Sequence, residues 1–213
     1  MKIDCYQIGK RIMDVCFSIG GLILFSPILV GTAIWIKLVS PDGPVFADIP
    51  LRVGLGGKNF RFLKFRSMIP HAHEWLQSRP ELLQKWKENN FKLDPDPRLI
   101  KGAQFIRKSS IDEMPQFINV LKGDMSVVGP RAYHDFEIEA QLAKHPHLRS
   151  EMDEVLTVKP GITGLWQTSG RSQIEFEDRV KLDATYARKK SLMYDLILIL
   201  KTPLVVIIGK GAY

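Results

Sequence analysis

Residues 107–116 read RKSSIDEMPQ, and the rest of the chain is interpreted outward from this stretch. Ser110 precedes Glu113 by three positions, the spacing of a capping box, which predicts that a helix begins here. Asp112 would then lie in the first helical turn, where free backbone N–H groups and the helix dipole favour its ionised form. An ionised Asp112 beside two basic residues could be a nucleophile, a metal ligand or both. The alternative is that Ser110 and Glu113 only cap a helix, because this spacing is common.

The composition is that of one domain with a buried core, since 45% of the 213 residues are hydrophobic and 25% are charged. The net charge of +7 suits nucleic acid, anionic lipid or phosphorylated small molecules. No nucleic-acid module with interleaved aromatic and basic residues is present, so nucleic acid is not an expected partner. Cys5 and Cys16 lack Cys or His neighbours at metal-ligand spacing, which argues against a disulfide framework or a zinc site and favours a reducing, cytosol-facing location.

Residues 15–36 carry no charge and would be about 33 Å long as a helix, enough to span a bilayer. Pro27 lies near the middle and removes a backbone donor, and Ser26 could cap a second half-helix. Basic residues flank both ends, and basic flanks prefer the cytosol. Two alternatives stay open, namely a kinked spanning helix and a re-entrant segment that breaks at Ser26-Pro27 and returns to the same face.

The C-terminal residues 192–208 are apolar except for a few positions that include Asp195 and Lys201. Charges at these positions argue against a spanning helix, so a helix lying on the membrane surface is predicted, with a buried core helix as the alternative. A turn at residues 40–44 separates a membrane anchor, residues 1–39, from a cytosolic domain, residues 40–213.

The middle of the chain predicts an α/β fold, mostly helical with short strands. A hairpin is expected between residues 46–53 and 59–65, with Lys64 and Arg66 on one strand face that would suit phosphate or simply be solvated. Arg131 and Arg171 each follow a predicted short strand, where an arginine can bind phosphate through two hydrogen bonds. Asp183 lies in an apolar helical pattern and could be exposed or orient a basic partner.

Twelve motifs follow one another in order along nearly the whole chain. They are KR at 10–11 with Asp14, SP at 26–27, GPVF at 43–46, RVG at 52–54, KFRSM at 64–68, DPR at 96–98, RKSSIDEMPQ at 107–116, NVLKGDMS at 119–126, VGPR at 128–131, KPGITG at 159–164, SGR at 169–171 and LD at 182–183. In this ordered set the chain resembles the bacterial sugar transferases, the monotopic polyprenyl-phosphate phosphoglycosyl transferases. Its C-terminal end is similar to the branch that transfers galactose or glucose phosphate.

The resemblance implies transfer of a sugar 1-phosphate from a UDP-sugar, with a hexose such as galactose or glucose favoured, to undecaprenyl phosphate, with release of UMP. It also implies Mg²⁺, a re-entrant helix broken at Ser26-Pro27, and contact with membrane lipid at the cytosolic face of the bacterial inner membrane. Apart from the resemblance, the region of Trp75 and Trp86 could serve as the contact surface of a homodimer. Asp112 would attack the diphosphate and form a covalent phosphosugar intermediate, with Glu113 as its partner, and both carboxylates would hold the metal. The residues expected to bind the phosphates or the nucleotide sugar are Lys64, Arg66, Arg98, Arg107, Arg131, Arg171 and Asp183.

Overall fold

A computed structural model describes residues 5–89, 93–170 and 174–208. The helices are α1 (Cys5–Val39), α2 (Ala72–Gln77), α3 (Pro80–Glu88), α4 (Ala103–Lys108), α5 (Gln116–Lys122), α6 (Asp135–Lys144), α7 (Arg149–Val155), α8 (Leu165–Ser169), α9 (Phe176–Lys189) and α10 (Leu192–Ile208). The strands are β1 (Arg52–Val53), β2 (Asn59–Phe60), β3 (Ser126–Val128) and β4 (Gly161–Thr163), and the 3-10 turns are η1 (Leu55–Gly57), η2 (Ile111–Glu113) and η3 (Pro146–Leu148). The prediction of a mostly helical chain with short strands is confirmed.

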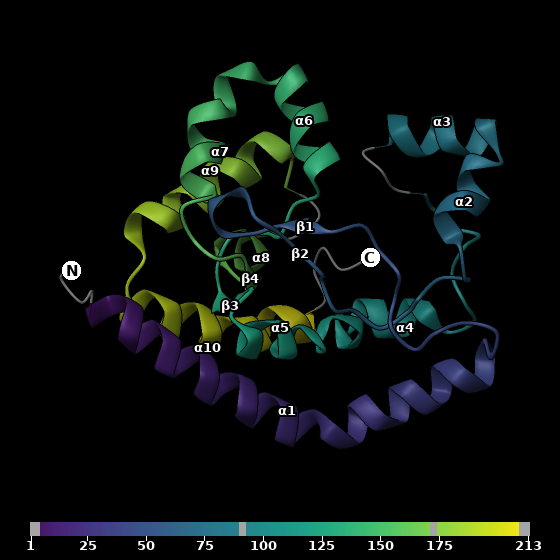
Figure 1. Ribbon diagram of the computed structural model, residues 1–213, viewed down its shortest axis with the longest axis horizontal. Coiled ribbons are helices and arrows are strands. Elements are labelled where there is room, and N and C mark those ends of the chain that lie inside the picture. Colours follow the sequence, from purple (N-terminus) through teal and green to yellow (C-terminus); the bar gives the residue numbers. More distant parts are fainter. Residues whose placement is uncertain (1–4, 90–92, 171–173, 209–213) are drawn as a thin grey trace.

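The long helix α1 runs along one side of the molecule and bends near its middle (Figure 1). The predicted interruption at Ser26-Pro27 is instead a bend within one continuous helix. Pro27 has no N–H to donate to the carbonyl of Ile23, and Ser26 Oγ donates to that carbonyl at 2.8 Å. Ser26 therefore compensates for the proline rather than capping a second helix. By length and composition α1 could cross a membrane, and many of its apolar side chains are exposed.

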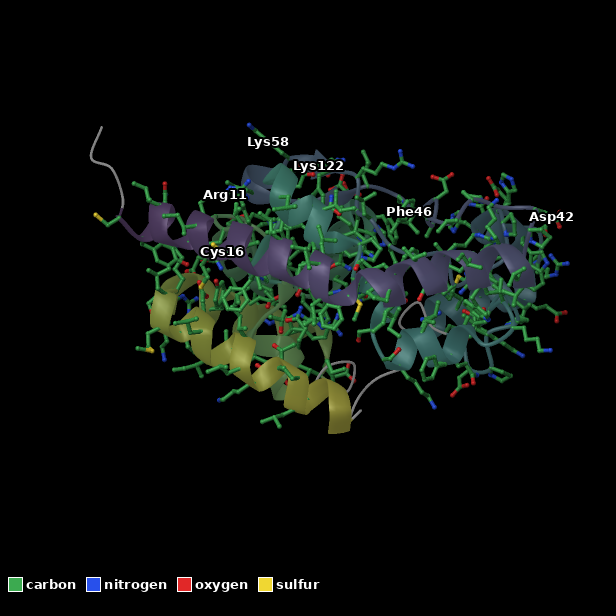
Figure 2. The ribbon with its side chains drawn as sticks, turned by 90° about the horizontal axis from the view of Figure 1, so that it is seen from below. Arg11, Cys16, Asp42, Phe46, Lys58 and Lys122 are labelled. Carbon is green, nitrogen blue, oxygen red and sulfur yellow. The ribbon has the colours of Figure 1, made fainter. Side chains whose placement is uncertain are left out.

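The first half of α1 is tied to the body of the protein by polar contacts. Arg11 donates to the carbonyls of Val120 and Leu121 at 2.6 and 2.7 Å, which caps the end of α5. Buried Asp14 accepts hydrogen bonds from Ser126 and from the backbone N–H that follows it. Seen from below, α1 crosses this face with α10 beside its first half (Figure 2). The bonds of Arg11 and Asp14 fix where α1 lies relative to α5 and β3.

The parallel pair β3–β4 lies at the centre of the fold and ends just before Arg131. Ser126 pairs with Gly161, and the backbones are so close that a Cβ on Gly161 would lie 2.0 Å from the N of Gly129. Only glycine fits such an approach. The sequence predicts a tight loop at residues 159–164 and a short strand and turn from residue 165 onward. The strand lies instead at residues 161–163, and residues 165–169 form helix α8. The reason is that the glycine-rich segment can approach β3, and the chain turns away after Gly164.

The predicted hairpin is confirmed, with β1 antiparallel to β2 and Arg52 opposite Phe60. It is extended by an antiparallel bridge between Phe46 and Phe65, whose rings stack at a centroid distance of 5.7 Å. A backbone hydrogen bond from Phe65 N–H to the carbonyl of Asp112 then joins this segment to η2. The hairpin thus carries Lys64 to the turn that holds the two adjacent carboxylates.

Candidate active site

A cavity of about 1100 Å³ lies between the turn η2, which carries Asp112 and Glu113, and the helices α1 and α10. One part of its lining is charged and polar, and includes Arg52, Lys64, Arg107, Asp112, Glu113, Gln116 and Arg131. The other part is an apolar wall from α1 and α10, with Phe17, Leu24, Phe25, Ile199, Pro203 and Val206. Cys16, which Figure 2 labels between these two helices, belongs to this wall. The cavity therefore joins a site for charged groups to a surface suited to a hydrocarbon chain.

Asp112 and Glu113 share one ammonium group. Lys64 Nζ lies 2.9 Å from Asp112 Oδ2 and 3.1 Å from Glu113 Oε1. Asp112 is only 2% exposed, whereas 42% of the Glu113 side chain is exposed. The two neighbouring carboxylates thus differ sharply in their access to solvent.

The predicted capping box is wrong. Ser110 has a left-handed backbone, with φ of 57°, and its side chain makes no capping hydrogen bond. Instead the backbone N–H of Glu113 donates to the carbonyl of Ser110 at 3.2 Å, which closes a 3-10 turn ahead of α5. Asp112 is therefore presented by a strained, tight turn, since non-glycine residues rarely adopt a positive φ.

Burial raises the pKa of Asp112, and the neighbouring Glu113 adds to this rise while Lys64 opposes it. The sequence led us to expect that a helix start would favour ionised Asp112. Burial has the opposite effect, since it favours the protonated carboxyl. Burial also acts to raise the pKa of Glu113, but Lys64 and then Arg131 outweigh it and lower that pKa. For Lys64 burial acts to lower the pKa, and the two carboxylates outweigh it, so the pKa is raised. The charge of Asp112 consequently depends on Lys64.

Two neighbouring arginines, Arg52 and Arg131, line the cavity. Arg131 follows β3 and lies over the ring of Trp166 at 5.4 Å. Arg52, at the start of β1, donates to the carbonyl of Ala132 at 2.9 Å and lies 5.1 Å from the ring of Phe62. Burial and the proximity of Arg131 lower the pKa of Arg52 to about 9. Arg52 was not among the predicted site residues, although it begins the RVG motif at residues 52–54 that contributes to the family resemblance.

Several buried donors in this cavity lack a hydrogen-bond partner among the residues that the structure describes. They are Nε of Arg52 and Arg131, Nε2 of Gln116 and Nε1 of Trp166. Leaving a buried donor unpaired costs about 1–3 kcal/mol, so such donors favour a ligand rich in acceptor oxygens. Gln116 and Trp166 were not predicted, because no local pattern indicates that they face a cavity.

The structure places two predicted phosphate ligands away from the cavity. Arg66 is buried and donates to the carbonyls of Pro44, Ser40 and Met68 and to Ser40 Oγ, which closes the loop after α1. It therefore does not share the direction of Lys64. Arg98 forms a paired interaction with Asp96, at 2.9 and 2.7 Å. The predicted ligand Arg107 does line the cavity, and Arg171 lies outside the described residues.

Asp183 lies beneath the arginine site rather than in it. It is fully buried, and its Oδ2 accepts hydrogen bonds from the backbone N–H of Arg131 at 3.1 Å and from Tyr133 Oη at 2.9 Å. Of the two sequence alternatives, exposure and orientation of a basic partner, exposure is wrong, and the contact that Asp183 makes with the basic residue Arg131 is to its backbone N–H. Asp183 holds the backbone of Arg131 in place.

Asp183 should make folding stability depend on pH. Burial raises its pKa from the ordinary 3.8 to about 7, so between these values the unfolded chain has lost a proton that the folded chain keeps. Stability should fall as pH rises from about 4 to about 7 and then level off, with a total loss on the order of 4 kcal/mol. Asp183→Asn keeps an acceptor for Tyr133 but has no charge to bury, so it should lack this decline. Thermal unfolding of both proteins from pH 4 to 8 checks this, and parallel profiles would contradict it.

The carboxylate pair suits a hard divalent cation. Asp112 and Glu113 already converge on a single positive group, and Glu113 is open to the cavity. Mg²⁺ at phosphate sites is commonly held by one or two carboxylates together with substrate phosphates and water. The two residues therefore fit a metal that binds together with a phosphorylated ligand.

Comparison with known proteins places this site in context. The family model described as "Bacterial sugar transferase" matches residues 5–209. The chain is 40% identical over 208 residues to an undecaprenyl-phosphate galactose phosphotransferase of Salmonella typhimurium, covering 96% of this chain and 41% of that protein. It is 37% identical over 210 residues to the exopolysaccharide production protein ExoY of Rhizobium meliloti, covering 96% and 88%. A UDP-glucose:undecaprenyl-phosphate glucose-1-phosphate transferase of Escherichia coli is 35% identical, covering 96% and 41%. The chain thus spans about two fifths of the first and third relatives and most of the second.

Proposed function

Because this chain belongs to the bacterial sugar transferase family, we propose that it transfers a sugar 1-phosphate from a UDP-sugar to undecaprenyl phosphate and releases UMP. The observation that carries the proposal is that the same cavity is lined by carboxylates, a lysine and arginines on one part and by an apolar wall on the other. The printed activities of the galactose and glucose phosphotransferases support this reaction and favour a hexose donor. The similarity to ExoY supports a role in exopolysaccharide production. Since the proposed product is a lipid-linked sugar, the reaction would be the first membrane step of polysaccharide or glycoconjugate synthesis.

In the first step, a carboxylate oxygen of Asp112 attacks the phosphorus that bears the sugar. The bond from this phosphorus to the bridging oxygen breaks, UMP leaves as an anion, and the phosphosugar remains bonded to Asp112. Arg52 and Arg131 line the same cavity and would stabilise the negative charge on the diphosphate and on UMP. Lys64, 2.9 Å from Asp112, keeps the carboxylate ionised until it attacks.

In the second step, a phosphate oxygen of undecaprenyl phosphate attacks the same phosphorus. The bond to Asp112 breaks, the carboxylate is restored beside Lys64, and undecaprenyl diphosphate-sugar is released. The apolar wall from α1 and α10 would receive the first part of the polyprenyl chain, since hydrocarbon is stabilised by burial against apolar surface. The acceptor phosphate would thereby be held next to Asp112.

Asp112 and Glu113 would hold Mg²⁺, which when bound would neutralise charge on the diphosphate. Glu113 is suited to this role because its side chain is exposed to the cavity and its pKa is lowered, burial being outweighed by Lys64 and the arginines. The different exposure of the two carboxylates supports different main roles, with Asp112 as the nucleophile.

We also propose that α1 enters the cytosolic face of the bacterial inner membrane and returns to it at the bend near Pro27. With the exposed native Cys5 and Cys16 replaced by serine, single cysteines in place of Lys2 and Asp42 should both react with a membrane-impermeant reagent from the cytosolic side only. The reason is that the basic flanks at both ends favour the cytosol. Reaction of position 2 from the opposite side alone would establish a spanning helix.

The proposed reaction is tested by measuring UMP release from a panel of UDP-sugars, with Mg²⁺ and undecaprenyl phosphate in detergent. Release should occur with a hexose donor such as UDP-galactose or UDP-glucose, and should require the lipid phosphate for continued turnover. Failure of every donor in a broad panel, with folded protein, would contradict the proposed function.

A further inference from the structure

Two histidines and a glutamate meet on the side of the molecule opposite α1, where α6, α7 and α9 lie together (Figure 1). His145 ends α6, His147 lies in η3, and Glu177 is in the first turn of α9. His145 Nδ1 is 3.7 Å from Glu177 Oε2, and His147 Nε2 is 3.4 Å from Glu177 Oε1. The three candidate ligand atoms all lie within 4.8 Å of one another. None of these residues lines the cavity described above.

A tetrahedral metal site needs its ligand atoms somewhat closer together than the 4.8 Å within which these three lie. Zinc binds imidazole nitrogen and carboxylate oxygen at about 2.0–2.2 Å, which places neighbouring ligand atoms about 3.3–3.5 Å apart. Small side-chain rotations would therefore bring the three donors around one ion without backbone movement. All three side chains are at least 35% exposed, which leaves room for water as a fourth ligand.

We propose that His145, His147 and Glu177 bind a divalent transition-metal ion of the zinc class. Imidazole donors select such metals over Mg²⁺, which prefers oxygen alone. The ion would link the corner between α6 and α7 to the beginning of α9. Because α9 also carries Asp183, which holds the backbone of Arg131, the ion would stabilise the part of the fold that supports the arginine site.

Lys181 supplies a specific test of this site. Its Nζ lies 2.6 Å from Glu177 Oε1, so the ammonium competes with a metal for the same oxygen. Lys181→Met removes this competitor and should tighten metal binding. A simple cluster of histidine–glutamate ion pairs would gain no affinity for metal from that change.

The experiment is a calorimetric titration of the untagged full chain in detergent with Zn²⁺ alone, after removal of bound metal by a chelator. One tight equivalent is expected, and His145→Ala or His147→Ala should weaken it by about 100-fold or more, since even loss of a supporting residue costs 10–100-fold. The matched control is the double variant His71→Ala/His73→Ala, which removes an exposed histidine pair of the same spacing beside Glu74. This control and Glu113→Gln should keep the tight equivalent.

Several results would overturn the site. They are the absence of a tight equivalent in the wild type, an unchanged affinity in the His145 and His147 variants, or no tightening in Lys181→Met. UMP release without added zinc should be the same in the His145 and His147 variants as in the wild type, which shows that they fold. Because the titration does not depend on turnover, it stands apart from the test of the proposed reaction.

Discussion

Asp112→Asn is expected to lower UMP release by about 10⁴-fold or more, the size of effect seen when a catalytic nucleophile is removed. The amide has nearly the same shape as the carboxylate but cannot attack phosphorus. Its oxygen can still accept a hydrogen bond from Lys64, which lies 2.9 Å away in the wild type. The variant should therefore fold, and its thermal unfolding midpoint should be close to that of the wild type. Steady-state turnover with UDP-hexose and undecaprenyl phosphate measures the loss.

The matched control for Asp112→Asn is Glu113→Gln, the same chemical change on the next residue of the same turn. This variant should turn over more slowly because a metal ligand and a partner of Lys64 are weakened, but it should still form the covalent intermediate. An Asp112→Asn protein with turnover near the wild-type rate would contradict the nucleophile assignment. The assignment would also be contradicted if Asp112→Asn formed the covalent intermediate and Glu113→Gln did not.

Lys64→Met should have the second-largest effect, a loss of about 10²–10³-fold in kcat, as when one preorganised charge-stabilising donor is removed. Lys64 contacts both carboxylates, at 2.9 and 3.1 Å. Without it, burial and repulsion from Glu113 would act unopposed to raise the pKa of Asp112, so less of the nucleophile would be ionised. Removing one partner of a buried ion pair also destabilises the fold. We expect a loss of about 3 kcal/mol in the free energy of unfolding, which is the low end for such changes because Glu113 is partly exposed.

The control for Lys64→Met is Lys58→Met, which removes the same charge from the exposed turn of the same hairpin (Figure 2). Its turnover and unfolding midpoint should match the wild type. Lys64→Arg should recover part of the activity, because it restores the positive charge beside Asp112 without the same geometry. Full turnover in Lys64→Met would show that Asp112 does not depend on this ammonium.

The parts of the candidate site whose positions can be read from the sequence are those encoded locally. Asp112 and Glu113 are adjacent in one turn, and Lys64 is delivered by a hairpin whose alternating pattern is visible in the sequence. The detail of that turn was not predictable, because the capping-box spacing does not reveal that Ser110 takes a left-handed backbone.

Other side chains reach their places through tertiary packing. Arg66 faces the loop after α1, where its guanidinium donates hydrogen bonds to the carbonyls of Ser40 and Pro44. Arg52 and Gln116 enter the cavity only once β1, α5 and β3 are assembled. The core between α6, α7 and α9 includes Leu142, Met152 and Val180. On α6 and α7 charged neighbours mask the apolar stripe, so the sequence there does not reveal which side chains are buried.

The most direct test of the central claim is to trap the intermediate. The wild-type protein is mixed with UDP-hexose and Mg²⁺ without undecaprenyl phosphate, quenched rapidly and digested with trypsin, and the peptide of residues 109–122 is analysed by tandem mass spectrometry. A phosphosugar on Asp112, formed with about one UMP released per protein molecule, is the result expected of a two-step displacement. Under the same conditions, an unmodified peptide despite UMP release, or a phosphosugar on Glu113 instead, would contradict it.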